Sequence, residues 1–238
     1  MMEKSIGLMS EIGFRIGIAG TYTNLGAIYH DQGRYQDAFE THQKSLSISK
    51  EMANLPGQIL SYANLGPVCI DLGKYDEAIT YLEQCIDLMH TMKIKIYEPQ
   101  ARVSLSRAFL ELGKPAKAKE EALKAMDVAQ ELKQKASLGF ANRMLGMVEA
   151  DELKRGAAEI TNSEKRDVVE RHLEESLEIF TELKMEHEKG RTHLELANFY
   201  KLTGNRIGFE EHLARARETL VKLGASGDLR RIQEVESP

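Results

Sequence analysis

The sequence predicts an all-α protein, a right-handed superhelix in which antiparallel helical hairpins stack as a solenoid. The composition fits a helix-rich protein with an ample core, because 42% of the 238 residues are hydrophobic, 29% are charged and only five are proline. Leucines at the same place in the pattern recur every 40 residues, and the last step is 51 because the fourth repeat is 11 residues longer. These leucines are Leu25, Leu65, Leu105, Leu145 and Leu196.

Small residues keep the same register as the leucines. One follows each leucine directly, and another comes 20 positions after it once the 11 extra residues are counted. Small side chains at fixed places predict that the two helices of each repeat approach closely. The first set is Gly26, Gly66, Ser106, Gly146 and Ala197, and the second is Ser45, Cys85, Ala125, Ser176 and Ala216.

Glycines mark the end of the first helix in most repeats. They stand eight residues after the leucine, where a left-handed residue would end the helix, at Gly33, Gly73, Gly113 and Gly204. The second helix then begins near Tyr35, Tyr75 and Pro115, and proline suits a first helical turn.

This register divides the chain into five complete repeats within a single solenoid, residues 1–238. Residues 1–16 parallel a second helix without its partner, which indicates either a fragment of a longer array or a solitary capping helix. The insertion near 152–165 is either a neutral lengthening or a lip over one edge, and Asn162 or Ser163 is expected to cap the helix after it. The repeats are 17–53, 54–94, 95–134, 135–186 and 187–223, and 224–238 form a short helix and tail.

The pattern resembles the tetratricopeptide repeat, TPR, whose usual length is 34 residues. Repeats three to five match less well, because Pro115, Val169 and Phe209 replace usual residues. A 40-residue period is similar to the longer repeats of Partner-of-Inscuteable-type scaffolds, kinesin light chains and bacterial regulatory TPR arrays. The matching residues are Tyr22, Leu25, Gly26, Tyr29, Gly33, Tyr35, Ala38 and Ser45, and again Tyr62, Leu65, Gly66, Cys69, Gly73, Tyr75, Ala78 and Cys85.

Charge and cysteine usage narrow the functional class. A net charge of −5 argues against nucleic-acid binding, since no excess of lysine and arginine is available to neutralise phosphates. No apolar run is long enough to span a membrane, and the first residues lack the order of a secretory signal. Cys69 and Cys85 occupy small apolar positions and are expected to be buried, reduced thiols, so we expect a cytoplasmic protein.

No arrangement of residues indicates catalysis or a cofactor. The seven histidines show no metal-binding spacing, and the sequence contains no nucleotide-binding or nucleophile motif. His42 and His172 lie at or beside a position that is usually aromatic, which favours packed rings. We therefore expect no enzyme, no metal and no cofactor.

The TPR resemblance implies that the first helices line a concave groove, with the residues one before and two after each leucine facing it. Asn24 and Asn64 stand just before the leucine, and a primary amide can pair with the backbone of an extended peptide without reading its side chains. The alternative is that each asparagine bonds a neighbouring helix. Asn198, two residues after the last leucine, belongs to the second set of residues expected to face the groove.

Arginines and methionines continue this expected groove. Arg107 and Arg143 suit an acidic side chain or a carboxyl terminus, whereas the alternative is an ion pair with Glu111 or Asp151. Met144 and Met147 would add a soft apolar floor, or else belong to the core.

These patterns predict a protein-interaction scaffold that binds a peptide or partner segment in its groove, with no nucleic acid and no membrane. One alternative is a regulatory or sensory segment of a larger signalling protein, such as a transcription regulator or a cyclase. Another is self-association through the leading half repeat, whose apolar stripe is Ile6, Leu8, Met9 and Ile12.

Overall fold

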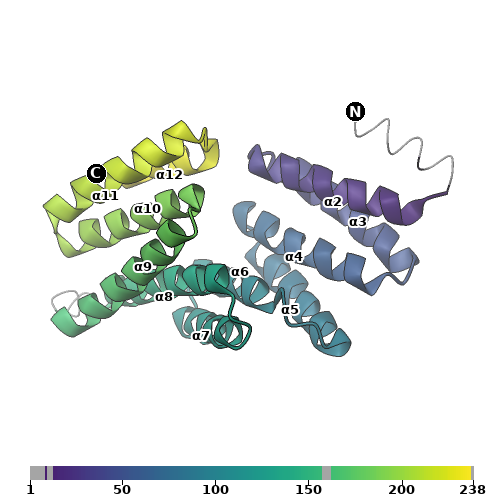
Figure 1. The fold of residues 1–238 in the computed structure, drawn as a ribbon, viewed down its shortest axis with the longest axis horizontal. Coiled ribbons are helices and arrows are strands. Elements are labelled where there is room, and N and C mark those ends of the chain that lie inside the picture. Colours follow the sequence, from purple (N-terminus) through teal and green to yellow (C-terminus); the bar gives the residue numbers. More distant parts are fainter. Residues whose placement is uncertain (1–8, 10–12, 157–161, 237–238) are drawn as a thin grey trace. The chain divides into compact units, whose positions relative to one another are not determined.

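The structure, a computed structural model, describes residues 9, 13–156 and 162–236. Within these residues the chain forms eleven helices and no strand, so the expected all-α fold is confirmed (Figure 1). The helices are α2 (Arg15–Asp31), α3 (Tyr35–Glu51), α4 (Leu55–Asp71), α5 (Tyr75–Met92), α6 (Glu98–Glu111), α7 (Pro115–Glu131), α8 (Lys135–Arg155), α9 (Ser163–Glu182), α10 (Glu186–Thr203), α11 (Arg206–Lys222) and α12 (Ser226–Glu236).

The helices belong to two compact blocks. In the N-terminal block, Met1–Leu112, α2 pairs with α3 and α4 with α5, and the first helices α2, α4 and α6 also pack in succession. In the C-terminal block, Gly113–Pro238, α8 pairs with α9 and α10 with α11, while α12 packs on α11 and α10. Successive helical hairpins are therefore the building unit of each block.

The turns between the two helices of four hairpins contain the expected left-handed glycines. Gly33, Gly73, Gly113 and Gly204 have φ between 69° and 73°, which confirms their role at the end of a first helix. The turn before α12 also has a left-handed glycine, Gly224, but the four turns that join successive hairpins have a left-handed residue with a side chain. These residues are Ala53, Lys93, Lys133 and Lys184, with φ from 48° to 57°.

Close packing inside the hairpins explains the small residues of the repeat. A Cβ added to Gly66 would lie 2.5 Å from the side chain of Leu82, and one added to Gly26 would lie 2.5 Å from the ring of His42. A glycine on the first helix thus makes room for a large side chain on the second. All five residues of the second small set are buried as well, which confirms the close approach that the sequence predicts.

The first two hairpins share a polar seam. The Ser45 hydroxyl lies 2.8 Å from that of Thr23, 3.1 Å from that of Ser61 and 2.9 Å from the carbonyl oxygen of Ala19. Because these groups bond one another, the seam tolerates polar side chains in the core. The C-terminal block buries apolar clusters, one of which is Leu153, Val169, Leu173, Leu196, Phe199 and Tyr200.

Some expected features fall outside the described residues. Residues 1–8 and 10–12 of the expected leading helix are among them, including Ile6, Leu8 and Ile12 of the apolar stripe, as are 157–161 of the insertion. Asn162 is described and caps α9, since its side chain accepts a hydrogen bond from the Lys165 backbone N–H at 3.3 Å. None of the described helices combines the length and apolar character that crossing a membrane requires.

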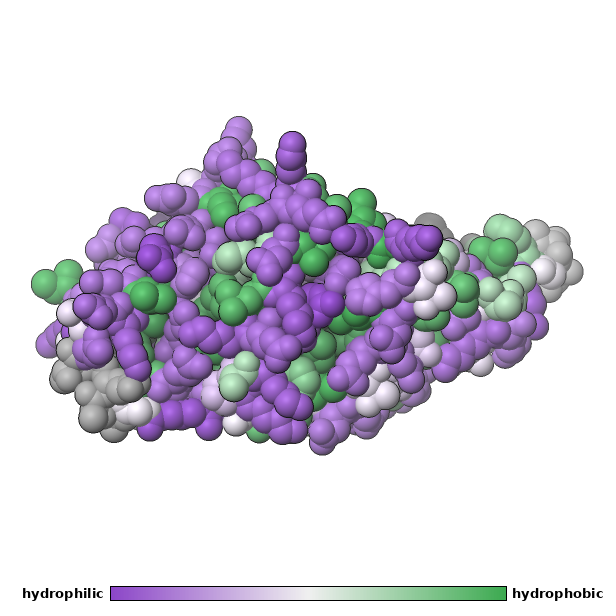
Figure 2. Space-filling view, turned by 90° about the horizontal axis from the view of Figure 1, so that it is seen from below, coloured by the Kyte–Doolittle hydropathy of each residue, from purple (hydrophilic) through white to green (hydrophobic). Residues whose placement is uncertain are grey.

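The surface is mostly hydrophilic. Figure 2 shows one face of the molecule, on which hydrophilic residues predominate and hydrophobic residues lie in separate patches. Several exposed apolar side chains belong to the N-terminal block, among them Phe14 and Ile16, each 53% exposed, and Leu60, 48% exposed.

Candidate peptide-binding surface

One side of α4 remains accessible along its length. Leu60 is exposed and Ala63, Asn64, Pro67 and Asp71 are partly exposed, at helical spacings that place all five on one stripe. We call these five residues the α4 stripe. The opposite side of the helix is in the core, so the stripe is the part of α4 that a partner can contact.

Asn24 and Asn64 lie at equivalent places on the neighbouring helices α2 and α4. Asn24 is exposed and Asn64 is partly exposed. Among the residues that the structure describes, neither amide has a hydrogen-bond partner. The alternative in which each asparagine bonds a neighbouring helix is therefore not what the structure shows.

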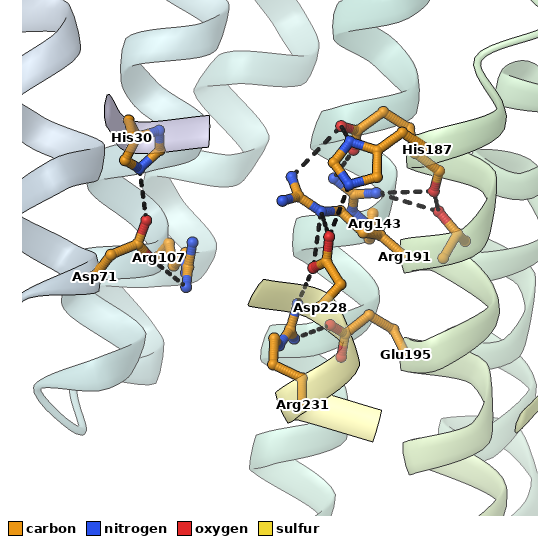
Figure 3. A network of polar contacts seen from close by, with 11 residues as sticks. His30, Asp71, Arg107, Arg143, His187, Arg191, Glu195, Asp228 and Arg231 are labelled. Carbon is orange, nitrogen blue, oxygen red and sulfur yellow. Dashed lines mark hydrogen bonds and ion pairs between the residues drawn. The ribbon is translucent and has the colours of Figure 1, made fainter. Parts of the chain in front are cut away.

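Arg107 of α6 makes an ion pair, although not with the carboxylate considered from the sequence. Its Nη2 lies 3.2 Å from Oδ1 of Asp71, whose Oδ2 lies 2.8 Å from Nε2 of His30 (Figure 3). Asp71 thus ties α4 to α2 on one side and to α6 on the other. The Arg107 side chain is 39% exposed, but its charge is balanced within the protein.

Arg143 of α8 is held inside the C-terminal block. Its guanidinium donates to Oε2 of Glu188 at 2.5 Å and to the Glu188 carbonyl oxygen at 3.1 Å, and it lies over the rings of Phe140 and Phe180. Burial lowers the pKa of Arg143, and the Glu188 carboxylate acts in the opposite direction. The partner is Glu188 and not Asp151, which pairs with Arg155 instead.

The other expected residues of the C-terminal block also have internal roles. Met144 is only 3% exposed and belongs to the core, and Met147 is partly buried. The Asn198 amide donates to Oε2 of Glu195 at 3.4 Å. Met144 therefore cannot form a floor for a ligand, because its side chain is already covered.

Comparison with known protein families matches residues 17–89 to the model described as Tetratricopeptide repeat. The described helices beyond this range continue as packed pairs. Residues 17–89 are tetratricopeptide repeats, and the described chain as a whole has the fold of a TPR array. A comparison with curated proteins found no match.

Solved structures share this fold at low sequence identity. BtubC (BKLC) from P. vanneervenii is 17% identical with a TM-score of 0.67, and the match covers 94% of the TPR array and 88% of that chain. A kinesin-light-chain-like protein with TPR-like repeats from Podosopora anserina is 19% identical with a TM-score of 0.57, covering 85% and 95%. Aspartyl phosphate phosphatase F from Bacillus subtilis is 16% identical with a TM-score of 0.68, covering 87% and 50%. At such identities the likeness shows a common fold and not a common activity.

A polar network that sequence reasoning missed joins α12 to α10. The Asp228 carboxylate is buried and lies 2.7 Å from Nε2 of His187 and 3.0 Å from Nε of Arg191 (Figure 3). Arg231 reaches back to Glu195 at 2.6 Å. Burial raises the pKa of Asp228, but the charge of Arg191 and the bonds from His187 and Arg191 hold it below its ordinary value.

The only signal of this network in the sequence is the repeat register. Ser226, where α12 begins, stands 40 residues after the start of α10, so α12 takes the place of another first helix. Its exposed residues, such as Arg230, Gln233 and Glu234, are polar.

Within the described part of the chain, no group of three or more histidine, cysteine, aspartate or glutamate residues could hold a metal ion. Cys69 and Cys85 are free and buried, and burial raises the pKa of each thiol to about 12. They are therefore poor nucleophiles.

Proposed function

We propose that this TPR array is a non-catalytic protein-interaction module, and that its N-terminal block binds an extended peptide segment across α2, α4 and α6. Repeat arrays stack helix pairs into extended binding surfaces, and the first helices line them in TPR arrays by the resemblance described above. The exposed sides of α2, α4 and α6 offer such a surface. We call it the first-helix face.

The observation that carries this proposal is the pair of amides without partners, Asn24 and Asn64. Each offers a donor and an acceptor about as far apart as those of a peptide bond, so each can pair with one peptide unit of a bound chain. Leaving both amides free on neighbouring helices gives the surface polar groups that only water satisfies in the unbound protein. A peptide backbone can replace that water without a loss of hydrogen bonds.

The proposed partner is not specifically acidic. Arg107 is balanced by Asp71, and Arg143 is bonded to Glu188 within the core of the C-terminal block. A carboxylate on the partner would therefore meet arginines whose charge is already neutralised. Arg143 and Met144 are left out of the proposed surface, while Arg107 remains at its margin. The free, buried cysteines agree with a cytoplasmic location, which is part of the proposal.

The test begins with selection of a random decapeptide display library on the wild-type chain, which supplies a labelled probe peptide. The double variant Asn24→Ala, Asn64→Ala should weaken binding of that probe by about 10- to 100-fold, since each lost bond contributes about 1 kcal/mol. Thermal stability should stay nearly the same, because neither amide bonds another described residue.

Asn198→Ala is the control, because this asparagine also lies on a first helix, but in the C-terminal block, where its amide bonds Glu195. It should leave the probe affinity unchanged. If the double variant binds the probe as tightly as wild type, the first-helix face is not the binding surface and the proposal fails.

A further inference from the structure

We propose that the first-helix face recognises an uncharged, extended segment through a backbone carbonyl, that of Ala63, which Pro67 leaves without its helical partner. This inference rests on the proposed function and specifies the partner. In the wild-type protein the carbonyl and the neighbouring Asn64 amide form one recognition element. The carbonyl accepts a hydrogen bond from a backbone N–H of the bound segment, and the amide bonds the adjoining peptide unit.

Pro67 interrupts the hydrogen bonding of its own helix. Pro67 lies inside α4, which continues to Asp71. Proline has no backbone N–H, so the carbonyl of Ala63 lacks the donor that residue 67 would supply in a regular helix. The proline ring also crowds this carbonyl, which disfavours the straight helical geometry. Proline at this position therefore makes α4 less stable than a residue with a backbone N–H would.

The Ala63 carbonyl lies on the accessible side of α4. Ala63, Asn64 and Pro67 all belong to the α4 stripe and are all partly exposed. The carbonyl of Ala63 points along the helix towards residue 67, so it lies on the same side of α4 as the Asn64 amide. An acceptor without a partner is therefore placed on the accessible side and not in the core.

A proline two residues after the leucine occurs in one repeat only. The residues at the place of Pro67 in the other repeats are Ala27, Arg107, Met147 and Asn198, each of which has a backbone N–H. Only α4 among these helices frees a carbonyl in this way. The specificity of the surface is thus centred on the middle of the N-terminal block.

The surroundings define the chemistry of the segment. Leu60 is 48% exposed one turn before Asn64 and offers an apolar contact. On α2 the exposed residues within about one turn of Asn24 include the small Gly20 and Ala27, which leave room for a backbone to approach, and Ile28, which adds an apolar contact. Since Asp71 already balances Arg107, the face favours a neutral segment that has at least one apolar side chain.

The experiment uses the full chain and the probe peptide selected on wild type. Pro67→Ala restores the donor to the Ala63 carbonyl, so its thermal midpoint should rise while its affinity for the probe falls by about 5- to 10-fold. Pro115→Ala is the matched control, because Pro115 is the first residue of α7 and frees no carbonyl inside a helix. It should not change the affinity.

A second measurement separates loss of the carbonyl from a change in helix shape. Each backbone N–H of the probe is replaced in turn by N-methyl, which removes one donor. One such position should weaken binding to wild type by about tenfold and have little further effect on Pro67→Ala. Equal losses for both proteins at every position would overturn the inference.

The two proposals can fail separately. If the probe is insensitive to Asn24→Ala, Asn64→Ala, the proposed function is wrong and the inference falls with it. If the probe depends on these asparagines but binds wild type and Pro67→Ala equally, the proposed function stands and the Ala63 carbonyl has no role. Enrichment of highly charged probes would likewise contradict the neutral segment.

Discussion

His42 offers a direct test of how a buried ring nitrogen without a partner limits the stability of the N-terminal block. The residue lies in α3, is 1% exposed and faces Gly26, and its Nδ1 has no hydrogen-bond partner among the described residues. Burial, with a smaller contribution from the charge of His30, lowers the pKa of His42 from 6.5 to about 4. We predict that His42→Leu makes the protein more stable and less sensitive to acid.

The direction of the pH effect on stability follows from which state, folded or unfolded, binds the proton more readily. In the unfolded chain His42 binds a proton as the pH falls through 6.5, whereas in the folded protein it stays neutral until about pH 4. The unfolded state therefore binds more protons between these values, and acid favours it. The stability is fully present above pH 6.5 and declines as the pH falls towards 4. The loss is about 2 kcal/mol at pH 5 and about 3 kcal/mol at pH 4, since each pKa unit corresponds to about 1.4 kcal/mol.

Leucine is the appropriate replacement because the next repeat has it at this place, where Leu82 packs on Gly66. At pH 7.5 the variant should be more stable by about 1 kcal/mol, because a buried ring nitrogen without a partner is removed. At pH 5.0 the advantage should grow to about 3 kcal/mol, since the proton-linked loss disappears as well. Urea unfolding followed by circular dichroism at the two pH values measures both differences.

Gln43→Leu is the control, because Gln43 is the exposed neighbour of His42 on α3. It should unfold with the pH dependence of wild type. Some acid sensitivity will remain in every variant, because burial, together with the charges of His212, Arg215 and Lys189, also lowers the pKa of His193 to about 4. Equal losses of stability for wild type and His42→Leu between pH 7.5 and 5.0 would refute the reasoning.

Two further substitutions test packing and the terminal helix. Gly66→Ala should lower the free energy of unfolding by about 1–3 kcal/mol, because its Cβ would lie 2.5 Å from the side chain of Leu82. Gly20→Ala should raise the free energy of unfolding by about 0.5–1 kcal/mol, because its Cβ would have no other atom within 4 Å. A loss of stability in both variants would contradict the packing argument. Asp228→Asn should speed amide hydrogen exchange in α12 and destabilise it by about 1–2 kcal/mol, because the buried carboxylate loses its charge while Arg191 stays partly exposed and paired with Glu188. The exposed Glu234→Gln should leave exchange unchanged. Slow exchange in both variants would show that the ion contacts do not hold α12.

Much of the fold could be predicted because residues with the same structural role recur at the same position in several repeats. Gly33 and Gly73 stand where a chain must turn with positive φ, and Gly26 and Gly66 stand where two helices touch. The left-handed residues between hairpins could not be found in this way, because Lys93 and its equivalents carry side chains and give no signal.

The candidate surface was predictable only in part. The register placed Asn24 and Asn64 on first helices, and the structure shows both amides to be accessible. The repeat register could not show that Met144 is covered, because the same apolar side chain suits a core and a binding surface.

The sequence by itself determined the helical hairpins, their register and the residues available on each first helix, because these depend on spacing along one chain. Only the tertiary structure decided which charges remain free. Arg107 meets Asp71 and Arg143 meets Glu188, each pair joining helices of different repeats. Such pairs depend on the distance between side chains of packed helices, and that distance is set by the packing of the repeats and not by their order.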